Sequence, residues 1–190
     1  IVIANNLTVK HANGRVVLDH VSFSIPQNKL IAFMGRSGIG KSTLAKVFLG
    51  LYPYEGQLII WGNELNKYNK TFLRNNIAYI PQEHIIINGS IKDNILFGNN
   101  LKEIDDADVI RILQQINAYS WVVEKGGIYA ALDENGRQLS GGQRQSIGIA
   151  RALLRHSNLI IMDETLSELD TGISHNVMKR LQEYRNKTII

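Results

Sequence analysis

The stretch Gly35–Ser42, Gly-Arg-Ser-Gly-Ile-Gly-Lys-Ser, has the spacing GxxxxGKS and follows an apolar run, Leu30–Met34. This order predicts a short buried strand, a glycine-rich loop and then a helix that begins near Lys41. Glycines allow the loop backbone to wrap around a phosphate chain and to point its N–H groups inward. The helix contributes a positive N-terminal end, and Lys41 contributes a point charge for the phosphates. The stretch therefore predicts a loop that binds a nucleoside triphosphate.

The nucleotide-binding residues that this motif predicts lie in one segment, the loop and the first helical turn. The Ser42 hydroxyl is in addition a candidate Mg²⁺ ligand, because this position of the motif presents an oxygen to the metal. A plain glycine-rich turn before a helix is the alternative. The candidates are Gly35, Arg36, Ser37, Gly38, Ile39, Gly40, Lys41, Ser42 and Thr43.

A second motif is Leu139–Gln143, which reads Leu-Ser-Gly-Gly-Gln. Ser140 is a favourable N-cap residue, and the apolar residues downstream recur at helical spacing. A helix N-terminus of this kind favours an anion. A plain capped helix would explain Ser140 but not two glycines in the first turn, where helix propensity is poor. We therefore interpret Ser140, Gly141, Gly142 and Gln143 as a second anion-binding segment.

With these motifs the chain resembles the nucleotide-binding domain of ABC transporters, whose signature motif is Leu-Ser-Gly-Gly-Gln. Further segments match the family's motifs in the family's order. The apolar run Leu159–Glu164, which ends in Asp-Glu, is similar to the Walker B strand. Ser167–Asp170 is similar to the D-loop, and Gln82 to the Q-loop glutamine. The resemblance runs from about Ile3 to the last residue.

The resemblance implies a role for each polar residue of these motifs. Glu164 is assigned as the general base, or as the group that orients the attacking water. Asp163 would hold Mg²⁺ with Ser42, and Gln82 would contact the Mg²⁺ and the water. A solvated turn or a cap is the alternative for the Asp-Glu pair, and a cap is the alternative for Asp170, which is assigned to the dimer seam. The cofactors implied are ATP and Mg²⁺.

Histidine enters the resemblance at two positions. The family usually places a tyrosine before the first turn, where its ring stacks on adenine, and the alignment puts His11 there. An ordinary exposed loop histidine is the alternative. The family also has a switch histidine on the strand after the D-loop helix. In this sequence that strand is cut at Ile190, a few residues before the switch position, and none of the histidines present occupies it. We therefore expect residues 1–190 to bind ATP but to hydrolyse it weakly.

Apolar spacing predicts an α/β core that is interrupted by a helical insert. The expected helices are 41–51, 108–116, 143–154 and 172–184, and the expected strands are 2–9, 17–25, 30–34, 57–61, 77–80 and 159–162, with an Asn13-Gly14 turn between the first two. The resemblance implies a P-loop NTPase (RecA-like) core with an N-terminal antiparallel β part and an inserted helical subdomain.

One domain, 1–190, would then have a core lobe at about 1–83 and 155–190 and a helical lobe at about 84–154. The chain opens at Ile1 rather than Met and closes on what reads as the start of a strand, so we expect a C-terminally truncated piece of a longer polypeptide. The alternative is that disordered or processed ends are left out of the sequence. The net charge of +4 is spread without a block of like charges, which gives no indication of a nucleic-acid groove.

The segment after Gln82 indicates the kind of ABC protein. Pro81–Ile91 is similar to a segment of ABC exporters, and Asp93–Gly98 continues the likeness. In exporters this region docks a short coupling helix of the membrane domain. Ile85, Ile86 and Ile87 are therefore expected to offer an apolar contact, with a buried strand end as the alternative.

The resemblance implies two protein partners. One is a second nucleotide-binding domain in a head-to-tail dimer, in which each ATP lies between one phosphate loop and the signature motif of the other copy. The other is the transmembrane domain of the transporter, through Gln82–Ile91. The implied location is the cytoplasmic face of a cell membrane, with no nucleic acid as partner.

Three other functions explain the motifs less well than the exporter. A soluble ABC ATPase that acts on nucleic acid would place a long coiled coil between the phosphate loop and the signature, but Lys41 and Ser140 are 99 positions apart (140 − 41) with no heptad run. A regulatory nucleotide-binding module without turnover does not explain the intact Asp163-Glu164 pair. Small-molecule kinases share the loop but not Leu-Ser-Gly-Gly-Gln.

Overall fold

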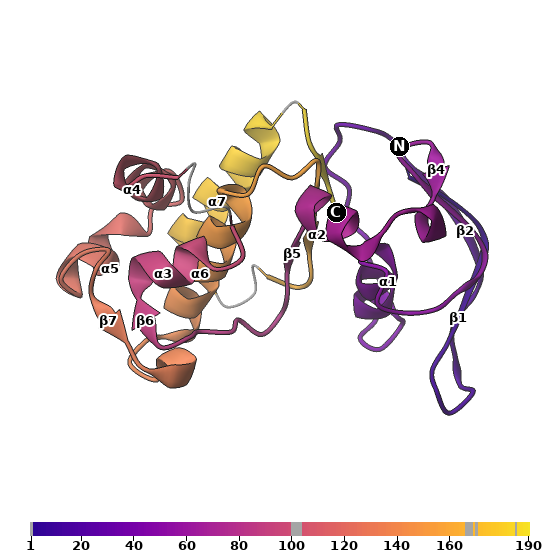
Figure 1. Ribbon diagram of the computed structural model, residues 1–190, viewed down its shortest axis with the longest axis horizontal. Coiled ribbons are helices and arrows are strands. Elements are labelled where there is room, and N and C mark those ends of the chain that lie inside the picture. Colours follow the sequence, from indigo (N-terminus) through magenta and orange to yellow (C-terminus); the bar gives the residue numbers. More distant parts are fainter. Residues whose placement is uncertain (1, 100–103, 166–168, 170, 185) are drawn as a thin grey trace. The chain divides into compact units, whose positions relative to one another are not determined.

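A computed structural model describes residues 2–99, 104–165, 169, 171–184 and 186–190 (Figure 1). The chain forms two compact units, the first of residues 1–78, 157–163 and 185–190, and the second of 79–156 and 164–184. The expected lobes differ from these units mainly at 164–184, which was assigned to the core lobe. This segment carries helix α7 (Thr171–Glu183), and α7 packs against α4 (Asp106–Gln115), which places it in the second unit.

The first unit contains a four-stranded antiparallel sheet in the order β2-β1-β3-β4. Val2 of β1 pairs with Ile25 of β2 on one side and with Ile60 of β3 on the other. The expected hairpin is confirmed, because the N–H of Gly14 donates to the carbonyl of His11 at 2.8 Å and closes the turn. The strands are β1 (Val2–Lys10), β2 (Val16–Ile25), β3 (Glu55–Ile60) and β4 (Asn63–Glu64).

A bulge in β1 explains one glycine of β3. The pairing of β1 with β3 shifts register after Asn5, and Asn6 has a positive φ of 49°. A Cβ on Gly56 would lie 2.3 Å from the carbonyl oxygen of Asn6, so only glycine allows the two backbones to approach this closely.

A second sheet of three strands has the order β5-β8-β9, with β8 and β9 parallel. The prediction of a strand at 30–34 is wrong. Within this run only Leu30 forms a bridge, to Ile189, and Met34 is 93% exposed. A strand requires hydrogen-bonding partners along its length, and the run bonds to β9 only where the N–H of Ile31 donates to the carbonyl of Ile189 at 2.9 Å. The remaining elements are α1 (Lys41–Phe48), a 3₁₀ helix (Leu65–Lys67), α2 (Lys70–Asn76), β5 (Ile77–Ile80), which passes from the first unit into the second, β8 (Leu159–Met162) and β9 (Thr188–Ile189).

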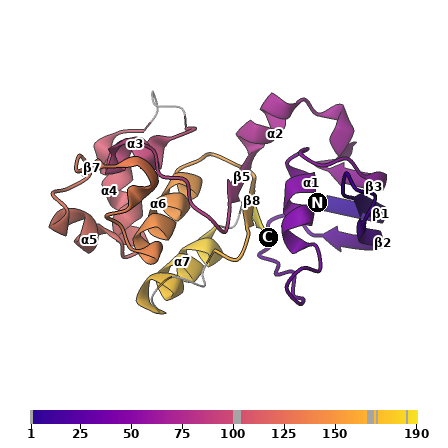
Figure 2. The same cartoon turned by 90° about the horizontal axis from the view of Figure 1, so that it is seen from below.

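The second unit is mainly helical, and α6 is its centre. Helices α3 and α4 both pack on α6, and Figure 2 shows the three side by side. The core is aliphatic, with Ile95 of α3, Leu113 of α4 and Ile147 of α6 fully buried. The elements besides α4 and α7 are β6 (Gly89–Ser90), α3 (Ile91–Leu96), α5 (Tyr119–Glu124), β7 (Ala131–Leu132), a 3₁₀ turn (Glu134–Gly136) and α6 (Gly141–Leu153).

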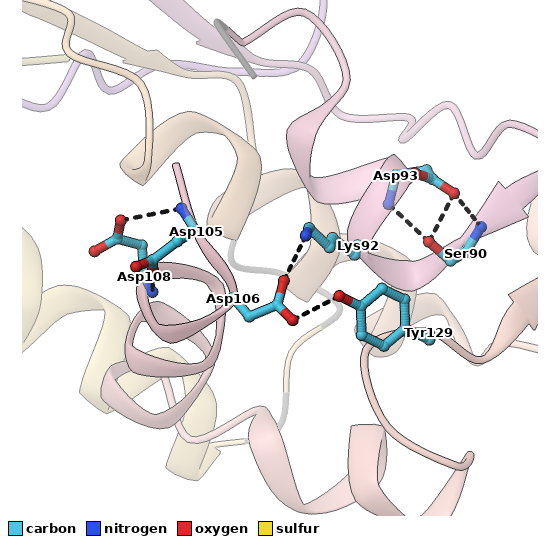
Figure 3. Close-up of polar contacts among 7 residues, drawn as sticks. All are labelled: Ser90, Lys92, Asp93, Asp105, Asp106, Asp108 and Tyr129. Carbon is cyan, nitrogen blue, oxygen red and sulfur yellow. Dashed lines mark hydrogen bonds and ion pairs between the residues drawn. The ribbon is translucent and has the colours of Figure 1, made fainter. Parts of the chain in front are cut away.

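Capping boxes start α3 and α4 (Figure 3). The hydroxyl of Ser90 accepts from the N–H of Asp93 at 3.0 Å, and the carboxylate of Asp93 accepts from the N–H of Ser90 at 2.8 Å. Asp105 and Asp108 form the same reciprocal pair at the start of α4. Each box satisfies backbone donors that a helix start leaves without an intrahelical partner.

An ion pair ties α3 to the start of α4. The ammonium of Lys92 contacts one carboxylate oxygen of Asp106, and the Tyr129 hydroxyl donates to the other at 2.6 Å (Figure 3). The hydrogen bond between these two side chains lowers the pKa of Asp106 and raises the pKa of Lys92.

Among the residues that the structure describes, we find no helix with the length and hydrophobicity of a membrane span.

Candidate nucleotide-binding site

The phosphate loop lies in the first unit and leads into α1, which begins at Lys41 as predicted and ends at Phe48. Residues 34–39 are exposed. The Lys41 ammonium donates to the carbonyl oxygens of Gly35 at 3.0 Å and Arg36 at 3.2 Å, so the side chain folds back over the loop. The positive charge therefore sits above backbone that a phosphate chain would follow.

Gly40 is required by its conformation and by its packing. It is the N-cap of α1 with φ of 104°, a left-handed conformation that L side chains rarely adopt. A Cβ there would lie 2.8 Å from Cδ2 of Leu18 and 3.1 Å from Cγ1 of Val17. The loop is thus seated directly on β2 at the point where the helix starts.

Ser42 and Asp163 come together although they are 121 positions apart in the sequence. The Ser42 hydroxyl donates to Oδ1 of Asp163 at 2.9 Å, and Asp163 is buried directly after β8. A hydroxyl and a carboxylate are hard oxygen donors of the kind that Mg²⁺ prefers. The pair therefore fits the metal position that the motifs predicted.

Glu164 and Gln82 meet in the second unit. Nε2 of Gln82 donates to Oε2 of Glu164 at 3.4 Å, and both side chains are exposed. Glu164 has a positive φ of 54°, which turns its side chain away from the direction that β8 would give it. The amide of Gln82 is thus within hydrogen-bond reach of the residue assigned as base. Its expected contact with Mg²⁺ stays a prediction.

The signature motif forms the N-terminus of α6, with Ser140 as the N-cap residue, as predicted. The Ser140 hydroxyl accepts from the N–H of Gln143 at 3.2 Å, and Oε1 of Gln143 accepts from the N–H of Ser140 at 3.0 Å. The side chain of Gln143 is therefore engaged in the cap. The first-turn backbone at Gly141 and Gly142 is the part of the motif best suited to an anion.

A pocket of about 530 Å³ opens beside this helix start. Half of its lining is the signature itself, and the other half comes from α7 and from the start of α5 and the residues before it. These other residues are distant from the signature in the chain and belong to no motif, so the sequence carries no signal for them. The lining residues are Asn117, Ser120, Trp121, Ser140, Gly141, Gly142, Gln143 and Ile173.

Two further residues predicted for the site are His11 and Asp170. His11 directly follows β1, at the start of the hairpin turn. Its ring contacts that of Tyr52 edge-on, with the two ring centroids 6.1 Å apart. Tyr52 was not predicted. Asp170, like Ser167 and Glu168 of the D-loop, lies outside the described residues, so its assignment stays a prediction.

The three isoleucines expected to form an apolar contact do not act alike. Ile85 is 69% exposed, whereas Ile86 is 3% exposed and packs against Gly136. Ile87 is intermediate in exposure and is held by Asn94, which accepts from its N–H at 2.8 Å. The expectation is therefore wrong for Ile86, because its side chain belongs to the core of the second unit.

The comparisons with known proteins agree with this geometry. The profile of the family described as ABC transporter matches residues 18–167. The chain is 36% identical over 169 residues to the ATP-dependent lipid A-core flippase of Alcanivorax borkumensis, a match that covers 88% of this chain and 29% of the flippase. It is 36% identical over 180 residues to the glutathione/L-cysteine transport system ATP-binding/permease protein CydD of Haemophilus influenzae, covering 95% of this chain and 30% of that protein.

A solved structure of a bacterial Atm1-family ABC exporter with ATP bound matches with a TM-score of 0.90 and 27% identity, over 99% of this chain and 33% of that chain. The chain thus spans about a third or less of the length of the relatives it matches. The chain belongs to the ABC transporter family, and its fold is that of the family's ATP-binding domain. The family resemblance and the fold class that the sequence predicted are confirmed.

Proposed function

We propose that this chain binds and hydrolyses ATP as the motor domain of an ABC exporter, and that two domains close around two ATP molecules. The observation that carries the proposal is the Ser42–Asp163 contact at 2.9 Å, next to a lysine-bearing phosphate loop. This contact supports the proposal because it brings two hard oxygen donors, of the kind that Mg²⁺ prefers, next to the glycine-rich loop within one compact unit.

The first unit would hold the nucleotide. The loop 35–40 and Lys41 would bind the β- and γ-phosphates, and Ser42 and Asp163 would hold Mg²⁺. The metal, when bound, would neutralise charge that develops on the phosphates. His11, with Tyr52 beside it, would contact the base.

In the second unit, Glu164 would accept a proton from the attacking water, with Gln82 orienting its carboxylate. Their contact at 3.4 Å is long, and catalytic hydrogen bonds commonly shorten only when the substrate complex forms.

The signature motif would act on the nucleotide held by a second copy. The amides at the start of α6 and the Ser140 hydroxyl would meet the γ-phosphate of that nucleotide, with Asp170 near the seam between copies. Closure would be favoured while the γ-phosphate is present, because two helix N-termini then face one triphosphate. The partners proposed are thus a second nucleotide-binding domain and, through Gln82–Ile91, a transmembrane domain.

The exporter role is supported by the relatives, which include a lipid A-core flippase and a solved ABC exporter. On that basis we place the domain at the cytoplasmic face of a cell membrane, within a larger transporter. The nucleic-acid alternative has no comparable support, because no charge block or coiled-coil insert accompanies the motifs.

A complementation experiment tests the head-to-tail arrangement. Because residues 1–190 are expected to hydrolyse ATP weakly, the variants and the wild type are compared in a C-terminally extended chain. Lys41→Ala removes the loop charge and Ser140→Ala removes the signature hydroxyl, so each variant alone should hydrolyse almost no ATP. Random mixing makes half of the dimers mixed, and each mixed dimer holds one intact site of two, so about a quarter of the wild-type rate should return.

Asp105→Ala is the matched control, because it removes a capping residue from α4 without touching the proposed site. It should keep the wild-type rate. If the mixture is as inactive as the separate variants, the site does not combine two copies. If wild-type protein fails to bind MgATP, the proposed function is wrong.

A further inference from the structure

His84 lies two residues after Gln82 and is packed into the middle of α6. Both ring nitrogens have no accessible surface, and neither has a hydrogen-bond partner among the residues that the structure describes. Leaving two polar atoms in this state costs stability, so the packing around the ring must favour the position strongly. The position therefore calls for a physical reason.

The reason is a notch in α6 at Gly148. A Cβ on Gly148 would lie 2.2 Å from Nδ1 of His84 and 2.7 Å from Cε1, so no residue other than glycine leaves room for the ring. Arg144 lies four residues before Gly148 and Arg151 three residues after it, so the three share one face of the helix. The imidazole is seated in this face where Gly148 has no side chain.

Arg151 adds a second attachment between the same two segments. Its Nη2 donates to the carbonyl oxygen of Ile85 at 3.1 Å, and its Nε donates to that of Asn94 at 2.9 Å. Arg144 donates to the carbonyl of Leu139 at 2.7 Å, just before the signature serine. The backbone after Gln82 is thus fastened to the helix whose first turn is the signature motif.

We propose that His84 is a positioning residue: its contact with Gly148 makes the segment after Gln82 and the signature helix α6 move as one body. The inference rests on the proposed function, in which Gln82 responds to nucleotide and the start of α6 faces the nucleotide of a second copy. His84 touches neither ATP nor water in this scheme. It acts through the placement of the first turn of α6 relative to Gln82.

Hydrogen exchange with and without MgATP tests the contact in the 190-residue chain. In the wild type, MgATP should slow exchange in two peptides together, one that contains Gln82 and one that covers Gly141–Gly148. In His84→Ala the affinity for MgATP should stay within about twofold, while the nucleotide-dependent slowing at Gly141–Gly148 falls about tenfold. His175→Ala, which removes an exposed imidazole of α7, should behave as wild type.

A second pair of variants separates positioning from folding. Gly148→Ala should lose the same coupling, because its methyl group cannot coexist with the imidazole. His84→Ala combined with Gly148→Ala should recover about half of the slowing, since the methyl group then fills space that the ring has left. Full slowing at Gly141–Gly148 in His84→Ala would overturn the proposal, as would a double variant no better than either single one. Absence of MgATP binding by the wild type would instead overturn the proposed function.

Discussion

Acid should destabilise this chain specifically through His84. Burial, followed by the positive charges of Arg151 and Arg144, lowers the pKa of His84 from 6.5 to about 4, because the protonated ring would lose hydration and face like charges. In the unfolded chain the ring takes up its proton at the ordinary pKa. Between these two values the unfolded state binds more protons, so stability is complete above about pH 6.5 and falls as the pH drops toward 4.

The size of the effect follows from this difference in proton uptake. At about pH 5 the unfolded ring is almost fully protonated and the folded ring is almost fully neutral, which corresponds to about 2 kcal/mol. Both ring nitrogens are inaccessible, but the residue as a whole is only partly buried. Solvent screening of the exposed part reduces the expected loss to about 1 kcal/mol.

Urea unfolding at about pH 7.5 and about pH 5 measures this loss. The matched variant is His84→Leu, which keeps a similar side-chain volume and cannot titrate. Every other residue is the same in both proteins, so the contributions of the other groups cancel in the comparison. We expect the wild type to lose about 1 kcal/mol more than the variant between the two pH values.

An equal loss in both proteins would refute the reasoning, because the ring would then titrate alike in the folded and unfolded states. The protonation of the ring can also be followed directly by its proton resonances in NMR. A midpoint close to 6.5 in the folded chain would show that burial beside two guanidinium groups does not act on it.

Three further variants probe the nucleotide site. Gly40→Ala should lower the free energy of unfolding by about 2–4 kcal/mol in a urea titration, because the residue has a positive φ and its Cβ would press on Leu18. Ser140→Ala should lower it by about 1 kcal/mol through the lost cap, and a change below about 0.3 kcal/mol would contradict the capping role. Asp163→Asn should leave stability within about 1 kcal/mol, since Ser42 can still donate to the amide oxygen. It should weaken ATP binding about tenfold when Mg²⁺ is present and little when the metal is chelated.

Features that depend on neighbouring residues could be predicted from the amino-acid order. The loop between Gly35 and Ser42, the start of α1 at Lys41 and the cap at Ser140 are all where the motifs predicted. A cap or a glycine conformation involves atoms a few positions apart, so the local order of residues decides it. Family membership followed from the same motifs, because the family is defined by such contiguous segments.

Contacts between residues distant in the chain could be seen only in the folded protein. Ser42 contacts Asp163, which is 121 positions away in the sequence, and Gln82 contacts Glu164, which is 82 positions away. No local sequence pattern predicts either contact. The apolar residues of the run 30–34 predict a strand, yet within this run only Leu30 forms a bridge, to Ile189. Gly148 reads as an unfavourable residue inside a helix until the ring of His84 is seen against it. In each case the deciding interaction lies between segments that the chain keeps apart and that packing alone brings together.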